Sequence, residues 1–167
     1  MTHSAKVMLL GAIGVGKTSL ANRFVFDRFD TDYKTTIGVN ILTHDVVLPE
    51  EFPAETLRLV LWDTDGDFGQ TLFTTTYILG AAGAIVVADA TRALTVEHMF
   101  RLADAFVEKM PGRALTCVVN KCDLAADGLD KLLNGSRHAI LRTSARTGDG
   151  VANLFQSVGI AIRRRGF

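Results

Sequence analysis

The segment GAIGVGKT, Gly11 to Thr18, has the residue types and spacing of a phosphate-binding loop. Glycines let backbone N–H groups curl around a phosphate, and the start of a following helix adds positive potential. Lys17 can reach the outer phosphates of a nucleotide, and the Thr18 hydroxyl can ligate magnesium. The ordinary alternative is a glycine-rich turn before a helix. An apolar strand before the segment and a helical pattern after it favour the phosphate loop, and we expect a purine nucleotide as the ligand.

The tetrad NKCD, Asn120 to Asp123, follows an apolar run and indicates which base is bound. Guanine presents adjacent N1–H and N2–H donors that the carboxylate of Asp123 can accept, whereas adenine presents an acceptor at N1. A site built around a buried acceptor discriminates strongly, because the wrong base leaves that acceptor unpaired. Farther along, TSA at Thr143 to Ala145 precedes the last helical pattern. We expect a backbone N–H near Ala145 to serve guanine O6.

These polar segments all follow predicted strands, so a sheet must bring them together. Apolar strands alternate with helical patterns, which is typical of a mostly parallel sheet with helices on both faces. In such sheets ligands bind at the carboxyl edge. The predicted strands are Lys6 to Leu10, Leu42 to Leu48 with an antiparallel neighbour at Leu57 to Trp62, Ala84 to Asp89, and Ala114 to Asn120. Core-facing helical stripes run through Met99 to Phe106 and Val151 to Ile162.

Composition and charge exclude several classes of protein. The chain has 167 residues, 48% hydrophobic and 22% charged, and we expect residues 1–167 to form a single domain. Its 18 basic residues balance 18 acidic ones, so no overall field draws it to nucleic acid or anionic lipid. Cys117 and Cys122 lack the spacing of a disulfide framework or zinc site, which favours reduced thiols in a cytoplasmic protein. No export leader or membrane-spanning apolar run is evident.

Five separated segments together resemble the Ras superfamily of small GTP-binding proteins, over nearly the whole chain. They are the phosphate loop, TTIG at Thr35 to Gly38, WDTDG at Trp62 to Gly66, NKCD, and TSAR at Thr143 to Arg146. The resemblance is nearest the Rab-like branch, and a prokaryotic member is one form that it could take. It implies a P-loop GTPase fold, that is, an α/β domain whose mostly parallel six-stranded sheet is flanked by helices on both faces. It also implies GTP or GDP and Mg²⁺ as ligands.

The resemblance further implies roles for individual residues. Phe29 would stack on the guanine edge, Tyr33 would lie over the phosphates, and Gly66 would offer its N–H to the γ-phosphate. Thr36 would join Thr18 at magnesium and Asp63 would hold the ion through water, as suits hard oxygen ligands. The expected nucleotide-binding residues are Gly11, Ile13, Gly14, Val15, Gly16, Lys17, Thr18, Ser19, Phe29, Tyr33, Thr36, Gly66, Asn120, Lys121, Asp123, Ser144, Ala145 and Arg146. The expected catalytic residues are Lys17, Thr36, Gly66, Asp67 and Gln70, and the expected metal ligands are Thr18, Thr36 and Asp63.

Three positions depart from the family's pattern around the attacking water. Ile13 puts a β-branched apolar side chain near the γ-phosphate, where family members usually carry a small or polar residue. Asp65 replaces the alanine, and Asp67 the glutamine, of the usual DTAGQ. Aspartate is shorter than glutamine, cannot donate a hydrogen bond when ionised, and with an ordinary pKa of about 3.9 is a poor base for water. Gln70 could substitute only if the loop folds differently, and both aspartates could simply point to solvent.

Three hypotheses of function follow from these residues. The first is a switch that hydrolyses GTP slowly, and the second is a guanine-nucleotide-binding interaction module with negligible turnover. The third is a P-loop kinase or ATPase, against which NKCD argues. A switch would order residues 31–39 and 66–77 differently with GDP and GTP, and would contact an effector protein through them. An exchange factor and a GTPase-activating protein are further partners that the resemblance implies.

The remaining candidates have ordinary structural interpretations. His44 is expected on the exposed face of a strand, without a ligand-spaced partner for a metal. Arg163 to Arg165 either meet an anionic membrane or complement the end of a helix, and the second is more usual. No cysteine for prenylation is present near the end, and Thr2 excludes myristoylation, so we expect no stable membrane anchor. The chain is then either a soluble member of the family or one whose tail was removed.

Overall fold

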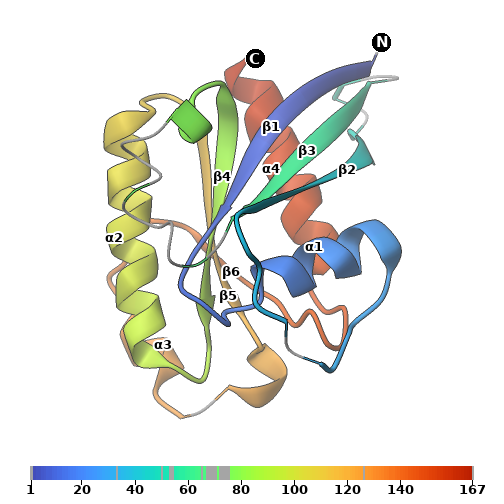
Figure 1. The fold of residues 1–167 in the computed structure, drawn as a ribbon. Helices are drawn as coiled ribbons and strands as arrows, with labels where there is room; N and C mark the ends of the chain where they lie inside the picture. The colour runs from blue at the N-terminus through green and yellow to red at the C-terminus, as the bar shows by residue number, and fades with distance from the viewer. Residues whose placement is uncertain are drawn as a thin grey trace.

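The computed structural model of the chain contains a six-stranded sheet with helices on both faces (Figure 1). It describes residues 2–32, 34–49, 51–52, 55–64, 66, 71, 76–125 and 127–166. The strands are β1 (Thr2–Leu10), β2 (Val39–Val47), β3 (Thr56–Thr64), β4 (Ala81–Asp89), β5 (Ala114–Asn120) and β6 (Ile140–Arg142). The helices are α1 (Lys17–Phe26), α2 (Ala93–Lys109), α3 (Leu129–Leu133) and α4 (Val151–Arg165), with short 3₁₀ turns η3 (Thr76–Ile78) and η4 (Cys122–Leu124).

The sheet order is β2-β3-β1-β4-β5-β6, and only the β2–β3 pair is antiparallel. Because the other strands run the same way, the loops that follow β1, β3, β4 and β5 all leave the sheet at one edge. This order places the segment after β1 between those after β3 and β4. The fold therefore brings the motifs of the sequence together although more than a hundred residues separate the first from the last.

The strand sequences match the burial of the two faces. Along β3, Leu57, Leu59 and Leu61 are buried while the intervening side chains are more exposed, as expected near the edge of a sheet. β4 is instead buried along almost its whole length, as expected for a central parallel strand covered on both sides. The predicted alternation in one strand and continuous apolar run in the other are both confirmed.

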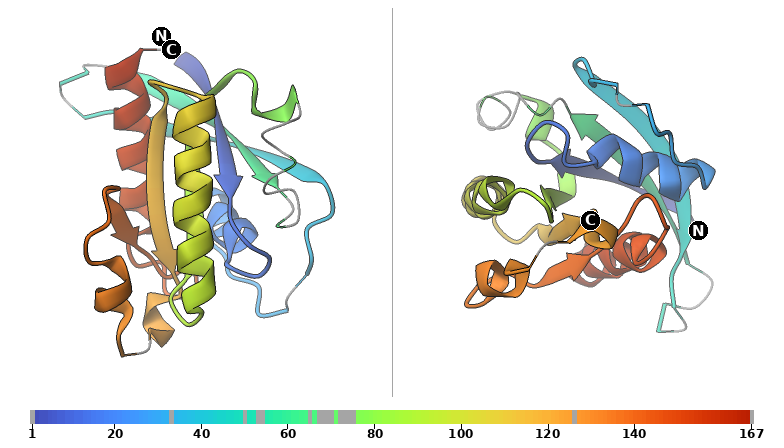
Figure 2. Two further views of the ribbon diagram at one scale, coloured as in Figure 1. Left: turned by 90° about the vertical axis from the view of Figure 1, so that its left-hand side faces the viewer. Right: turned by 90° about the horizontal axis from the view of Figure 1, so that it is seen from below.

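Two apolar cores lie on opposite faces of the sheet. The first packs α1 and α4 against β1 and β3 through side chains such as Leu20, Phe155 and Val158. The second packs α2 against the other face, with Met99 and Phe106 on Met8 and its neighbours. Figure 2 shows α2 on one side of the sheet and α1 and α4 on the other. The helical stripes predicted from the sequence are thus confirmed as core faces.

Several details differ from the sequence predictions. β1 begins at Thr2 rather than Lys6, because its first residues pair with β3 from Thr56 onward. The three-residue β6 was not predicted as a separate strand, since so short a segment has no readable periodicity. His44 is half-buried rather than exposed: its ring meets the edge of the Phe24 ring of α1, with centroids 4.5 Å apart.

Both cysteines are free thiols, as predicted. Cys117 is buried in the core beneath α2, and this burial raises the pKa of its thiol to about 12. Its interpretation as a core residue is therefore confirmed. In the described part of the chain, none of the helices combines the length and apolar character needed to cross a membrane.

The connection between β2 and β3 is fastened to the end of α4. Arg163 Nη2 lies 2.9 Å from Glu55 Oε1, and Arg164 Nη2 lies 2.7 Å from Glu51 Oε1. The Arg163 guanidinium also lies over the Phe52 ring, 5.3 Å from its centroid. Two of the three arginines considered for membrane contact are therefore engaged by acidic residues of the hairpin, and Arg165 donates to Ala161 O of its own helix.

Phe155 is the side chain whose loss should cost most on the α1–α4 face. It is fully buried, and its ring stacks on that of Phe24 with centroids 4.0 Å apart. We expect Phe155→Ala to lower the free energy of unfolding by about 3–5 kcal/mol, because it removes a large buried side chain and leaves a cavity. Urea denaturation at fixed GDP and Mg²⁺ measures this change. Val107→Ala, on the exposed side of α2, serves as the control, and equal losses in the two variants would contradict the packing described.

Candidate functional site

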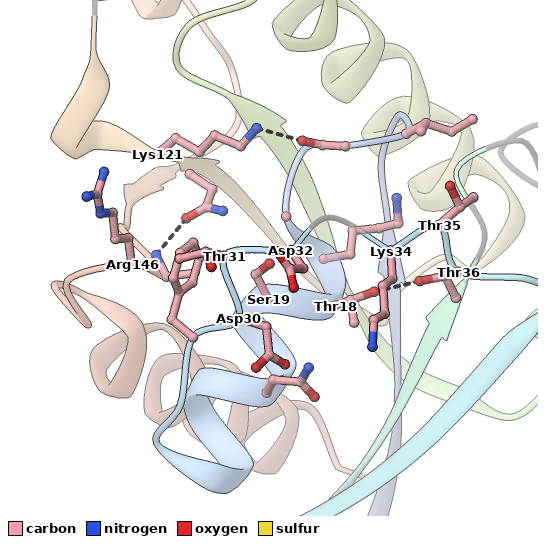
Figure 3. A pocket seen from close by; sticks show the side chains of 18 of the residues that line it. Thr18, Ser19, Asp30, Thr31, Asp32, Lys34, Thr35, Thr36, Lys121 and Arg146 are labelled. Atoms are coloured by element: carbon pink, nitrogen blue, oxygen red, sulfur yellow. Dashed lines mark hydrogen bonds between the residues drawn. The ribbon is translucent and has the colours of Figure 1, made fainter.

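A cavity of about 540 Å³ opens at the carboxyl edge of the sheet (Figure 3). Its wall comes from the loop between β1 and α1, the segment between α1 and β2, and the loops that follow β5 and β6. The predicted residues in this wall are Ile13, Gly14, Gly16, Lys17, Thr18, Ser19, Phe29, Thr36, Gly66, Asn120, Lys121, Asp123, Ala145 and Arg146. The predicted residues Gly11, Val15, Asp63 and Ser144 are buried next to them. Tyr33, Asp65, Asp67 and Gln70 lie outside the described residues.

The loop Gly11–Thr18 wraps around the Lys17 side chain. Lys17 Nζ donates to Gly11 O at 2.8 Å and to Ala12 O at 3.0 Å, so the ammonium group crosses the mouth of the loop. Within the described residues, the N–H groups of Gly14, Val15 and Gly16 donate to no protein acceptor. A run of unpaired N–H groups beside a lysine and a helix start is a binding site for an anion such as phosphate.

A glycine is needed at position 16 because the loop closely approaches the NKCD segment. Its backbone has a φ of +104°, and a Cβ atom built on it would lie 2.2 Å from Asn120 Nδ2. Asn120 Nδ2 in turn donates to Val15 O at 3.1 Å. The glycine therefore lets the phosphate loop and the NKCD segment share one wall of the cavity.

Three oxygen-bearing side chains converge beside the loop. Thr18 Oγ1 lies 2.7 Å from Thr36 Oγ1 and donates to Asp63 Oδ2 at 2.5 Å. Figure 3 shows the Thr18 and Thr36 side chains pointing toward each other. Asp63 Oδ1 is buried and has no hydrogen-bond partner among the described residues, and burial raises the pKa of this carboxyl group. Two hydroxyls and a carboxylate with an unused oxygen fit a hard cation such as Mg²⁺.

The end of the cavity formed by NKCD holds Asp123 in a fixed orientation. Asp123 Oδ1 accepts from Ser144 Oγ at 2.7 Å, while the carboxylate as a whole is exposed to the cavity. From the sequence we expected the Asp123 carboxylate to be a buried acceptor, but in the protein without a ligand it is exposed. A bound base would cover it. The Ala145 N–H donates to Asn120 Oδ1 at 3.1 Å, so it already has an acceptor besides the predicted guanine O6.

Lys121 connects the base end of the cavity to the phosphate loop. Its ammonium group donates to Gly14 O and to Asp89 Oδ2, both at 2.7 Å. Asp89 is buried at the end of β4. Although burial opposes its ionisation, hydrogen bonds from Lys121 and Thr91 lower the pKa of Asp89 below its usual value. The carboxylate is therefore ionised and anchors Lys121 at neutral pH.

Ile13 and Gly66 meet directly at the opposite end of the cavity. The Ile13 side chain lines the cavity and is 40% exposed. A Cβ atom on Gly66 would lie 2.4 Å from Ile13 N and 2.6 Å from Ile13 Cγ1. Gly66 therefore packs against the phosphate loop with no room for a side chain at its position.

Sequence reasoning missed several residues of the site. Arg23 of α1 donates to Ala145 O at 2.8 Å and to Arg146 O at 2.5 Å, which fixes the loop after β6. Arg92 binds the phosphate loop from the start of α2. No local pattern marks either arginine, because each contact depends on the strand order. The other missed residues of the wall are Asn22, Asp30, Thr64 and Leu124. Thr31, Asp32, Lys34 and Thr35 also line it and belong to the segment 31–39 that was expected to respond to the nucleotide.

The fold and the site together define a P-loop nucleotide-binding domain, with the phosphate loop after β1 and the NKCD segment after β5. A family model described as "Ras family" matches residues 6–164. The chain therefore belongs to the Ras family. Proteins of this family generally bind guanine nucleotides with Mg²⁺, hydrolyse GTP, and act with effectors, exchange factors and GTPase-activating proteins. The nearer likeness to the Rab-like branch and a prokaryotic origin stay predictions.

The contact between Gly16 and Asn120 predicts a loss of ligand binding in Gly16→Ala. The added methyl group would collide with Asn120 Nδ2 and would also strain a left-handed backbone. We expect affinity for a fluorescent GDP analogue to fall by about a hundredfold or more, which equals roughly 3 kcal/mol. Fluorescence titration measures it. Gly112→Ala, with a φ of +80° and no neighbour within 4 Å, controls for backbone strain alone. Equal effects in both variants would refute the collision.

Proposed function

We propose that this chain is a cytoplasmic guanine-nucleotide switch that binds GTP and GDP with Mg²⁺ and hydrolyses GTP slowly. The observation that carries the proposal is one cavity that joins three features. They are the N–H groups of Gly14, Val15 and Gly16, which have no protein acceptor within the described residues, the converging oxygens of Thr18, Thr36 and Asp63, and the oriented carboxylate of Asp123.

Guanine selectivity rests on Asp123. Ser144 Oγ donates to one carboxylate oxygen and so limits rotation of the group, which leaves acceptor capacity directed at the base. Guanine N1–H and N2–H match two acceptors, whereas adenine would face them with its N1 lone pair. Phe29 lines the same cavity and offers an aromatic surface for the base. This arrangement disfavours an ATPase or kinase.

The phosphates and the metal ion would occupy the other half of the cavity. Lys17 Nζ, which now binds two loop carbonyls, would exchange at least one of them for a phosphate oxygen. Thr18 and Thr36 would ligate Mg²⁺ directly, and Asp63 Oδ1, which has no hydrogen-bond partner in the described part of the chain, would hold a water of the ion. When bound, the ion neutralises charge on the phosphates. The residues from 31 to 36 would thus depend on nucleotide and metal for their position.

Slow hydrolysis is proposed from Ile13, Asp65 and Asp67. The Ile13 side chain already occupies part of the cavity next to Gly66, which narrows the space for a positioned water or an incoming arginine. Asp67 lacks the amide donor of the usual glutamine. Two unit charges about 4 Å apart interact by about 1 kcal/mol in water and about 4 kcal/mol at a surface-like dielectric, so an ionised Asp65 near the γ-phosphate would favour GDP over GTP. The alternative, a binding module with negligible hydrolysis, shares every binding residue.

An effector is proposed to bind across residues 31–39 and the neighbouring strands. Ile37 is 91% exposed, and Ile41, Tyr77 and Leu79 are also exposed apolar side chains. Trp62 lies between them, with its ring 6.2 Å from that of Tyr77 and with Lys6 Nζ 3.7 Å from its centroid. Exposed apolar groups beside a nucleotide-dependent segment suit a protein partner that reads the bound state.

Base selectivity provides the first test of this proposal. GTP and GDP should displace a fluorescent GDP analogue in the presence of Mg²⁺, whereas ATP at about a thousandfold excess should not, because a site built on a hydrogen-bonding acceptor rejects the wrong base by about 10⁴ or more. Asp123→Asn should shift preference toward xanthine nucleotides, since the C2 oxygen of xanthine needs a donor opposite it. The control is Asp127→Asn, an exposed carboxylate on the same loop outside the cavity wall. Comparable affinities for ATP and GTP would sink the guanine assignment.

Single-turnover hydrolysis provides the second test. We expect an intrinsic rate on the order of 10⁻⁴ per second or slower, similar to that of Ras without its activator. Asp67→Gln combined with Ile13→Gly should raise it by about tenfold or more, because the pair restores a donor and opens space for water. Asp30→Asn, an acidic residue elsewhere in the cavity wall, is the control. A wild-type rate of about 10⁻² per second that is lost in Asp67→Ala or Gln70→Ala would show that these residues form a working alternative.

A further inference from the structure

Three consecutive carbonyl groups of the phosphate loop are each held by a different side chain. Arg92 Nη2 donates to Ile13 O at 2.8 Å, Lys121 Nζ to Gly14 O at 2.7 Å, and Asn120 Nδ2 to Val15 O at 3.1 Å. Asn120 and Lys121 belong to the NKCD segment, but Arg92 comes from the turn between β4 and α2, which no motif in the sequence marks. Arg92 thus makes a contact of the same kind from another part of the chain.

Each of these bonds also sets the direction of an N–H group. In a trans peptide the C=O of one residue and the N–H of the next point in opposite directions, and the described chain has no cis peptide. A donor that holds Ile13 O therefore directs the Gly14 N–H the opposite way. Ile13 and Gly14 line the cavity whereas Arg92 does not, so the Gly14 N–H faces the cavity side.

The Arg92 guanidinium is itself held by Asp89. Arg92 Nε donates to Asp89 Oδ2 at 3.1 Å, and the same oxygen accepts from Lys121 Nζ. Thr91 donates to Asp89 Oδ1 through both its N–H and its hydroxyl, which fixes the plane of the carboxylate. The Asp89 side chain is only 2% exposed. One buried carboxylate therefore positions the two cations that hold neighbouring carbonyls of the loop.

We propose that Arg92 is a positioning residue for nucleotide binding, which orients the Gly14 N–H toward the phosphate chain. The proposal rests on the guanine-nucleotide function proposed above, and it assigns Arg92 to the phosphates rather than to the base. The Asp89–Arg92 pair sets the N–H direction before a ligand arrives, so less ordering is left for the binding step. The hydrogen bond from Arg92 matters more at Ile13 than a similar bond would elsewhere in the loop. The reason is that the β-branched side chain of Ile13 also packs against Gly66.

The planar fork of arginine is needed for this role. Nε and Nη2 reach two acceptors at once, Asp89 Oδ2 and Ile13 O, in a fixed mutual geometry. A lysine has one nitrogen on a flexible stem and cannot reproduce the fork. Arg92→Lys should therefore be intermediate between the wild type and Arg92→Ala.

The test compares nucleotide release with base preference. We expect Arg92→Ala to speed GDP dissociation by about tenfold, as estimated for one partly exposed hydrogen bond to a charged group, with a smaller effect in Arg92→Lys. The ratio of affinities for GDP and IDP should not change, since the two differ only in the base. Arg101→Ala, an exposed arginine of α2, is the matched control and should release GDP at the wild-type rate.

A residue-specific readout separates positioning from a general loss of structure. In the GDP-bound protein, Arg92→Ala should move the amide resonance of Gly14, whereas that of Gly16, whose direction Asn120 sets through Val15 O, should stay in place. Equal shifts at both glycines, or GDP release at the wild-type rate, would overturn the role of Arg92 and leave the proposed function standing. Failure of the wild type to bind GDP would overturn the proposed function, and this inference with it.

Discussion

The site depends on the backbone N–H groups of Gly14, Val15 and Gly16, which have no protein acceptor among the described residues. Such groups are costly to bury, and an isolated loop would turn them toward its own carbonyls or toward water. Here Lys17, Asn120, Lys121 and Arg92 donate to carbonyls of the loop and hold its conformation. A ligand rich in negative oxygen is what completes the hydrogen bonding of the N–H groups. The rest of the fold places the side chains that donate to the carbonyls of this loop.

The placement of these side chains depends on the order of the strands in the sheet. β1 lies between β3 and β4, so the loop after it is flanked by Asp63 at the end of one neighbour and Asp89 at the end of the other. The two carboxylates are both buried but differ in their partners. Within the described residues Asp63 Oδ1 has no hydrogen-bond partner and suits a cation, whereas both carboxylate oxygens of Asp89 accept hydrogen bonds from Lys121, Arg92 and Thr91. The same residue type thus has one role in ligand binding and another in support of the loop.

The sequence predicted most of the fold and the segments that line the cavity, because these are local patterns. The loop Gly11–Thr18 and the NKCD tetrad each place their chemistry in consecutive residues, and the long strands and helices carry clear apolar periods. The side chains that hold the loops of the site in place, Arg23 and Arg92, could not be predicted from the sequence. Arg23 and Arg92 act on carbonyls distant in sequence, and only the assembled sheet shows that they reach them. His44 was misjudged for a similar reason, since its strand presents it to Phe24 of α1 rather than to solvent.

The ion pairs between the β2–β3 hairpin and α4 attach the hairpin end of these two strands to the last helix. Glu55 is bound to Arg163 and Glu51 to Arg164, at the end of the hairpin far from the cavity. Strands can slide past each other by two residues and still keep their buried faces. In this chain such a slide of β2 and β3 against the rest of the sheet would break both ion pairs together. The hairpin end of β2 and β3 is therefore tied to α4, on the side of the molecule away from the cavity that the segment between α1 and β2 lines.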